Sequence, residues 1–233
     1  MARQEVTVVL THGAWADGSS WSKVVQALHQ NHIEAVTVPL PLTSFADDVA
    51  ALDRTLERVA GPVVLAGHAY AGAVIGATRN PGVKGLVYVA ALAPAEGQTV
   101  ADVFYMNAPH PQAPRLAPDG HGLIWLPTEA FATAFAQNAS AAEQAVLSAS
   151  QRPISPACIT VPVGRPLWRD VPTWYLLAEQ DRMIVPETQR FMAERMRARI
   201  SAHPVDHTPS VTAPGVVVAL LNDALRQIQG GMQ

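Results

Sequence analysis

Two histidines and an aspartate stand beside the ends of apolar segments, where they could carry proton-transfer chemistry. His12 lies just after the apolar run 6–10. Asp181 lies just after a second run, 173–178, and His207 precedes the last helical pattern. A histidine can accept and return a proton near neutral pH, and a neighbouring carboxylate can orient its ring. Because functional groups gather at the carboxyl ends of strands in open α/β sheets, these residues are candidates for one site.

The segment most specific for a chemistry is residues 63–72, with the sequence VVLAGHAYAG. An apolar strand there runs into a turn of small residues and leaves it as a helix. This arrangement resembles the nucleophile elbow, G-x-S-x-G, of the α/β-hydrolases. Gly67 matches the first glycine of that motif, and Ala71 occupies the place of the second. Ala69 occupies the place of the nucleophilic serine.

Two further loops extend the resemblance. The segment 10–15, LTHGAW, resembles the His-Gly loop that supplies one donor of the oxyanion hole in this superfamily. The resemblance implies that the backbone N–H groups of Ala14 and Tyr70 form that hole. The segment 177–186, LAEQDRMIVP, resembles the loop of the triad acid, and it assigns that role to Asp181.

The segment 205–209, VDHTP, resembles the loop of the triad histidine and assigns that role to His207. His203 for the base and Asp170 for the acid are the alternatives that the sequence leaves open. The order elbow, acid, histidine is that of the superfamily. The four motifs span nearly the whole chain and are most similar to the compact esterase and hydroxynitrile-lyase-like branch, which includes plant methyl-ester esterases. The resemblance therefore implies an enzyme of the carboxylic ester hydrolase type.

Ala69 departs from the family in kind, because a methyl group cannot attack a carbonyl carbon. Loss of the nucleophile from a serine protease lowers turnover by about 10⁶-fold, so acyl-enzyme chemistry is not expected of this chain as it stands. Three interpretations stay open. In the first, Ala69 is an inactivating replacement of an esterase serine. In the second, Ala69 is native, and His207 oriented by Asp181 serves proton abstraction, elimination, carbon–carbon lysis or decarboxylation. In the third, the chain is a ligand-binding pseudoenzyme.

The elements that must position these residues follow from hydrophobic periodicity. Short runs that are apolar throughout alternate with amphipathic helical patterns, which predicts a mostly parallel sheet covered by helices on both faces. This alternation of apolar runs and helical patterns stops after Ala93 and resumes near residue 171. We therefore expect an α/β-hydrolase fold whose core is formed by residues 1–93 and 171–233, with a helical lid inserted at 94–170. The expected strands, about six in number, are residues 6–10, 35–38, 62–66, 85–90, 173–178 and 200–203.

The lid is expected to roof the site and to set the polarity of the substrate. It carries several large apolar side chains, and some of them must face the cleft over Ala69 if the lid closes it. Such a roof favours a small, largely apolar ester or carbonyl substrate over a highly charged one. From the lid we assign substrate binding to Trp125, and we add His12 of the oxyanion loop.

Composition excludes several classes of protein. The 233 residues are 49% hydrophobic and 15% charged, which allows a large core and argues against disorder. The formal net charge of −3 gives no basic footprint, so nucleic acid is not an expected partner. Cys158 is the only cysteine, which rules out an internal disulfide and a cysteine-based zinc site. Pro204 lies between His203 and His207 and argues against a metal pair on a helix.

No segment points to a membrane, a leader or a cofactor. Apolar stretches stay below the roughly eighteen residues of a membrane helix, and Met1–Glu5 lack the features of a signal peptide. No G-x-G-x-x-G or Walker pattern follows a strand, so no nucleotide cofactor is expected. We therefore expect a cytoplasmic enzyme without cofactor or metal, whose partner is a small-molecule substrate. A homodimer is an assembly that the sequence leaves open.

Overall fold

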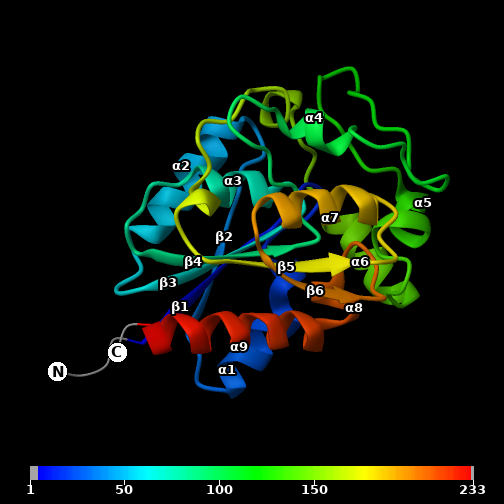
Figure 1. The fold of residues 1–233 in the computed structure, drawn as a ribbon. Helices are drawn as coiled ribbons and strands as arrows, with labels where there is room; N and C mark the ends of the chain where they lie inside the picture. The colour runs from blue at the N-terminus through cyan, green and yellow to red at the C-terminus, as the bar shows by residue number, and fades with distance from the viewer. Residues whose placement is uncertain (1–4, 232–233) are drawn as a thin grey trace.

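In the computed structural model, which describes residues 5–231, six strands form one sheet in the order β2-β1-β3-β4-β5-β6 (Figure 1). All neighbouring strands pair in parallel, as expected for strands joined through helices. The inner strands β1, β3 and β5 are buried along their whole length, which confirms the expected fold class. The strands are β1 (Thr7–Thr11), β2 (Ala35–Val38), β3 (Val63–His68), β4 (Val83–Val89), β5 (Thr173–Ala178) and β6 (Arg199–His203).

Helices cover both faces of the sheet, because successive side chains of each strand point to opposite sides. On one face lie α1 (Ser22–Gln30) and α9 (Pro214–Gly231), whose buried residues form one apolar cluster with the strands (Figure 1). On the other face lie α2 (Phe45–Leu56), α3 (Ala71–Ala77) and α7 (Pro186–Arg195). This second face forms a separate apolar cluster that also includes the lid. The lid therefore shares the hydrophobic core of the sheet.

Strand β3 is longer than the sequence predicts. It extends through Gly67 to His68, two residues beyond the expected end, because these residues pair with Tyr88 and Val89 of β4. The elbow consequently turns directly from a hydrogen-bonded strand into α3. That helix ends at Ala77.

Capping explains where the other helices begin and end. Ser44 caps α2, since its side chain accepts a hydrogen bond from the backbone N–H of Asp47 in the first turn. Helix α1 starts at Ser22, because Asp17 caps a 3₁₀ turn over Gly18–Trp21 that precedes it. Helix α7 ends at Arg195, since Arg197 adopts a left-handed conformation (φ 54) that directs the chain into β6.

The lid leaves the core between β4 and β5 and lies above the second face of the sheet (Figure 1). Its first helix was not predicted from the sequence, because five residues are too few for a periodic pattern. A capping box between Thr99 and Asp102 stabilises that short helix. The lid helices are α4 (Val100–Phe104), α5 (Thr128–Ala130) with the π-helical turn Phe131–Phe135 that continues it, and α6 (Ala141–Ser150).

No helix between residues 5 and 231 is long and apolar enough to cross a bilayer. The same part of the chain contains no group of three or more His, Cys, Asp and Glu residues placed to hold a metal ion. Cys158 is buried and forms no disulfide. The signal-peptide prediction concerns Met1–Gln4, which lie outside the described residues.

Candidate active site

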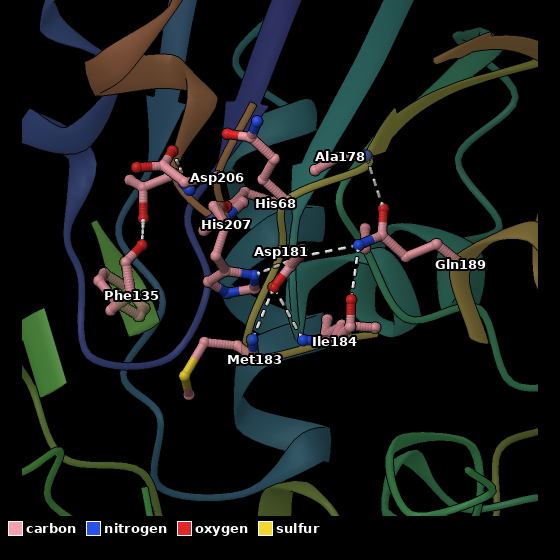
Figure 2. A network of polar contacts seen from close by, with 12 residues as sticks. His68, Phe135, Ala178, Asp181, Met183, Ile184, Gln189, Asp206 and His207 are labelled. Atoms are coloured by element: carbon pink, nitrogen blue, oxygen red, sulfur yellow. Dashed lines mark hydrogen bonds and ion pairs between the residues drawn. The ribbon is translucent and has the colours of Figure 1, made fainter. Parts of the chain in front are cut away.

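His207 and Asp181 form a hydrogen-bonded pair in two loops beyond the carboxyl ends of the strands (Figure 2). Asp181 follows β5, and His207 lies between β6 and the short helix α8 (Pro209–Thr212). The distance from His207 Nδ1 to Asp181 Oδ2 is 2.8 Å, and both side chains are buried. With the carboxylate as acceptor, Nδ1 carries the proton and Nε2 remains for a substrate.

The carboxylate of Asp181 is fixed by further donors (Figure 2). Its Oδ1 accepts hydrogen bonds from the backbone N–H groups of Met183 at 2.7 Å and Ile184 at 2.9 Å. Its Oδ2 also accepts one from Gln189 Nε2 of α7 at 2.8 Å. Gln189 is itself oriented by the Ala178 N–H, which donates to Gln189 Oε1 at 3.0 Å. The sequence analysis missed Gln189, because a lone amide inside a helix forms no motif.

Ala69 occupies the apex of the turn between β3 and α3. Its φ of 49° lies in the left-handed region, which a residue with a side chain adopts only when its surroundings hold it there. Its carbonyl accepts hydrogen bonds from the N–H groups of Gly72 at 3.1 Å and Leu92 at 2.9 Å. A Cβ on Gly72 would lie only 2.4 Å from the Leu92 oxygen, so this glycine is required for close packing. Ala71, at the second glycine position of the motif, fits into the core with its methyl group fully buried.

The loop of residues 10–15 lies directly against this turn. A Cβ on Gly13 would lie 3.0 Å from both the Ala69 Cβ and the His68 carbonyl oxygen, so a larger residue would require its neighbours to shift by a few tenths of an ångström. Ala14 and Tyr70 both line the same cavity as Ala69. Within residues 5–231, neither of their backbone N–H groups donates a hydrogen bond to another residue. The two donors are thus free for an oxygen atom of a ligand.

A cavity that opens to solvent joins these groups. The core contributes Ala69, Tyr70 and His207 to its lining, and the rest of the lining is almost wholly apolar. The apolar side chains that the lid contributes are Val100, Ala101, Phe104, Tyr105, Leu116, Ile124, Ile154 and Ile159.

Trp125 is not among the lining residues, contrary to the assignment made from the sequence. Its side chain is 45% exposed, and its indole N–H donates to Asp119 Oδ2 at 3.1 Å. The neighbouring Ile124 lines the cavity instead and pairs with Ile154 in an isolated bridge. Because adjacent side chains of an extended segment point to opposite sides, Trp125 faces away from the cavity.

His12 does not line the cavity either, and its assignment to substrate binding is not supported. Its ring is fully buried, with Nε2 accepting from the Leu40 N–H at 3.1 Å and Nδ1–H donating to the Gly13 carbonyl at 2.9 Å. His68 plays a related structural part, since its Nε2–H donates to the His207 carbonyl at 2.7 Å. Burial lowers the pKa of His12 to about 4 and, together with the nearby His207, that of His68 to about 3. Both rings are therefore neutral near pH 7.

These two histidines predict a loss of stability in mild acid. The unfolded chain takes up protons below about pH 6.5, whereas the folded chain protonates the two rings only near 4 and 3. The free energy of unfolding should hence fall as the pH drops from 6.5 to 4, by about 1.4 kcal/mol per pH unit for each histidine. Urea unfolding at pH 7 and pH 4.5 measures the loss. The double variant His12→Gln/His68→Gln should lose less over this interval, and an equally steep loss would contradict the assignment.

The lid contacts the His207 loop through a second buried carboxylate, that of Asp206. Asp206 Oδ2 accepts a hydrogen bond from the Asn138 N–H of the lid at 2.9 Å, and its Oδ1 accepts from Thr212 Oγ1 at 2.6 Å. The Thr208 hydroxyl donates to the carbonyl of Phe135, at the end of the π-helical turn. The lid therefore helps to position the loop that carries His207.

A sequence profile of the alpha/beta hydrolase family matches residues 8–220. The match includes the elbow and the loops of Asp181 and His207. The chain therefore belongs to the alpha/beta hydrolase family. No curated protein sequence matches it.

Several solved structures share the fold at low sequence identity. Polyneuridine aldehyde esterase superposes with a TM-score of 0.82 and 18% identity, over 95% of this chain and 99% of that one. A pyrethroid hydrolase from Sphingobium faniae JZ-2 gives 0.79 and 21%, over 95% and 98%. A histidine-to-alanine variant of tomato methylketone synthase I, complexed with β-ketoheptanoate, gives 0.82 and 15%, over 97% and 99%. At these identities the likeness concerns the fold.

Proposed function

We propose that this chain is an enzyme that acts on a small apolar carbonyl compound through acid–base chemistry at His207, without an acyl-enzyme intermediate. The observation that carries the proposal is the methyl group of Ala69 at the apex of the elbow, beside an intact His207–Asp181 pair. A pair arranged to move protons has no nucleophile to activate here. It can still serve a substrate whose own carbon or oxygen exchanges a proton.

Each group then has a stated task. His207 Nε2 takes a proton from the substrate or returns one, while Asp181 holds Nδ1–H and stabilises the imidazolium that forms. The N–H groups of Ala14 and Tyr70 stabilise negative charge on the carbonyl oxygen of an enolate or alkoxide. The apolar lining excludes water, which strengthens these interactions.

A short-chain β-keto acid is the first substrate class to test. His207 would take the carboxyl proton, and the bond between the carboxylate carbon and the α-carbon would break with loss of CO₂. The electron pair of that bond would form an enolate, whose oxygen the two N–H groups stabilise. Return of the proton from His207 to carbon would give a ketone. The apolar cavity suits the alkyl chain, and the β-ketoheptanoate held by one protein of the same fold supports this choice of probe.

Replacing His207 with glutamine tests the proposal. Decarboxylation of β-ketoheptanoate, corrected for the spontaneous reaction, should fall by about 10²-fold or more, because a general acid–base group contributes on that order. Binding of the ketone product should change by less than about threefold, since the cavity remains. Equal turnover in both proteins would refute the proposal. Tight binding with no turnover in either would instead identify a ligand-binding pseudoenzyme.

A second candidate is a serine esterase whose nucleophile has been replaced by Ala69. The paired N–H groups of Ala14 and Tyr70 support it, because two donors that line the cavity beside Ala69 could stabilise the oxygen of a tetrahedral ester intermediate. Restoring the serine separates this candidate from the first.

A further inference from the structure

A buried carboxylate lies behind the elbow, outside the groups used so far. Asp48 of α2 is fully buried and is not part of the cavity lining. Within residues 5–231 it forms no salt bridge. Its two oxygens instead accept hydrogen bonds from two different segments, the elbow and the loop before α2. A buried acid satisfied in this way holds those segments together.

The first of these bonds fixes Tyr70. Its phenol O–H donates to Asp48 Oδ2 at 2.6 Å, and the ring is buried. Tyr70 directly follows the left-handed Ala69, so its side chain and its backbone N–H belong to the same strained turn. Holding the ring limits rotation of that peptide group, and the direction of the N–H depends on this rotation.

The second bond fixes the wall of the cavity. The Leu42 N–H donates to Asp48 Oδ1 at 2.7 Å, and Leu42 is itself left-handed (φ 61). The Leu42 carbonyl accepts from the Ser155 N–H of the lid at 3.0 Å. The preceding Ile154 lines the cavity. Asp48 therefore connects the oxyanion donor on one side with a lid segment that lines the cavity on the other.

We infer that Asp48 is a positioning residue that acts through Tyr70 to aim its backbone N–H at the oxygen of the bound substrate. The inference rests on the oxyanion hole of the proposed function. Loss of one oxyanion donor lowers turnover by about 10²–10³-fold, and misplacement by about 1 Å lowers it by up to about 10²-fold. Because Asp48→Ala would misplace the donor without removing it, the expected loss is about 10- to 100-fold.

Ester hydrolysis in the Ala69→Ser background gives the first readout. Asp48→Ala and Tyr70→Phe should each lower kcat by that amount while KM changes less than about threefold. The kcat of the double variant should be no lower than that of the less active single variant, because both substitutions remove the hydrogen bond between Tyr70 and Asp48. Asp48→Asn can keep both contacts, because its amide oxygen accepts from the Leu42 N–H and its NH₂ group can donate to the Tyr70 hydroxyl oxygen, and it should recover most of the activity.

Asp53 supplies the matched control. It lies on the same helix and accepts an equally short hydrogen bond at 2.6 Å, but its partner is Thr78 at the far end of α3 and not a residue of the elbow. Asp53→Ala should lower the unfolding midpoint and leave kcat within about threefold. If Asp48→Ala and Asp53→Ala lower kcat equally, the role of Asp48 is structural only and the inference is overturned.

Anion binding gives a readout that does not depend on catalysis. With Ala69 in place, Asp48→Ala should weaken binding of 4-nitrophenolate about tenfold or more, and binding of the neutral nitrobenzene less than about threefold. If this selective loss is seen although neither ester hydrolysis by the Ala69→Ser protein nor β-keto acid decarboxylation is detected, the role of Asp48 is supported while the proposed function fails. Equal weakening of both ligands, no weakening, or no phenolate binding at all would overturn the inference.

Discussion

Replacing Ala69 with serine is expected to raise the hydrolysis of short-chain p-nitrophenyl esters by about 10³-fold or more. Removing the nucleophile from a serine protease lowers turnover by about 10⁶-fold, so its return has a large effect wherever the other groups are in place. The backbone at position 69 already has the left-handed conformation of an elbow, and a hydroxyl adds no new backbone strain. His207 would activate the hydroxyl, and the N–H groups of Ala14 and Tyr70 would hold the oxyanion. Assays with p-nitrophenyl and aromatic methyl esters, run side by side, measure the gain.

Two further variants isolate the cause of that gain. Ala101 of α4 lines the same cavity from the lid. Ala101→Ser therefore adds a hydroxyl to the cavity at a position that is not the elbow and has no base to activate it. It should leave hydrolysis at the starting level. Adding His207→Ala to the Ala69→Ser protein should abolish the gain. If serine at position 69 changes nothing, the groups are not arranged for acyl transfer, and the β-keto acid assay decides the function.

Replacing Asp181 with asparagine in the Ala69→Ser protein is expected to lower kcat by about 10³–10⁴-fold. In a serine protease the equivalent change leaves the geometry intact but selects the wrong imidazole tautomer, with a loss of about 10⁴-fold. Asp181 accepts hydrogen bonds on both oxygens, whereas an amide has only one acceptor oxygen. The NH₂ group of an asparagine at this position would face either His207 Nδ1 or the backbone N–H groups of Met183 and Ile184. Steady-state kinetics with a p-nitrophenyl ester measure the loss.

Asp206 provides the comparison for this variant. It is equally buried and adjacent to His207 in sequence, but its partners are Asn138, Thr208 and Thr212 and not the imidazole. Asp206→Asn should therefore lower stability while kcat stays within about tenfold. If Asp181→Asn kept kcat within tenfold as well, the assignment of Asp181 as the residue that orients His207 would be contradicted.

The fold followed from local patterns in the sequence to a large extent. The runs that are apolar throughout mark the buried strands, because only a strand covered on both faces needs apolar residues at every position. The limits of elements were less predictable. His68 is polar yet belongs to β3, because its backbone pairs with Val89 across the sheet. Helix α4 was missed, since its five residues depend on a capping box and on contacts with the lid and core.

The sequence by itself determined the fold class, the elbow with alanine at its apex and the loops that carry Asp181 and His207. These features are encoded in short segments, where residue type and spacing dictate a turn, a strand end or a helix start. Only the tertiary structure decided which side chains meet. It places Trp125 and His12 outside the cavity, and it brings Gln189 to Asp181 and Asp48 to Tyr70. Such contacts join elements separated in the chain, and they depend on how the helices and the lid pack on the sheet rather than on any local pattern.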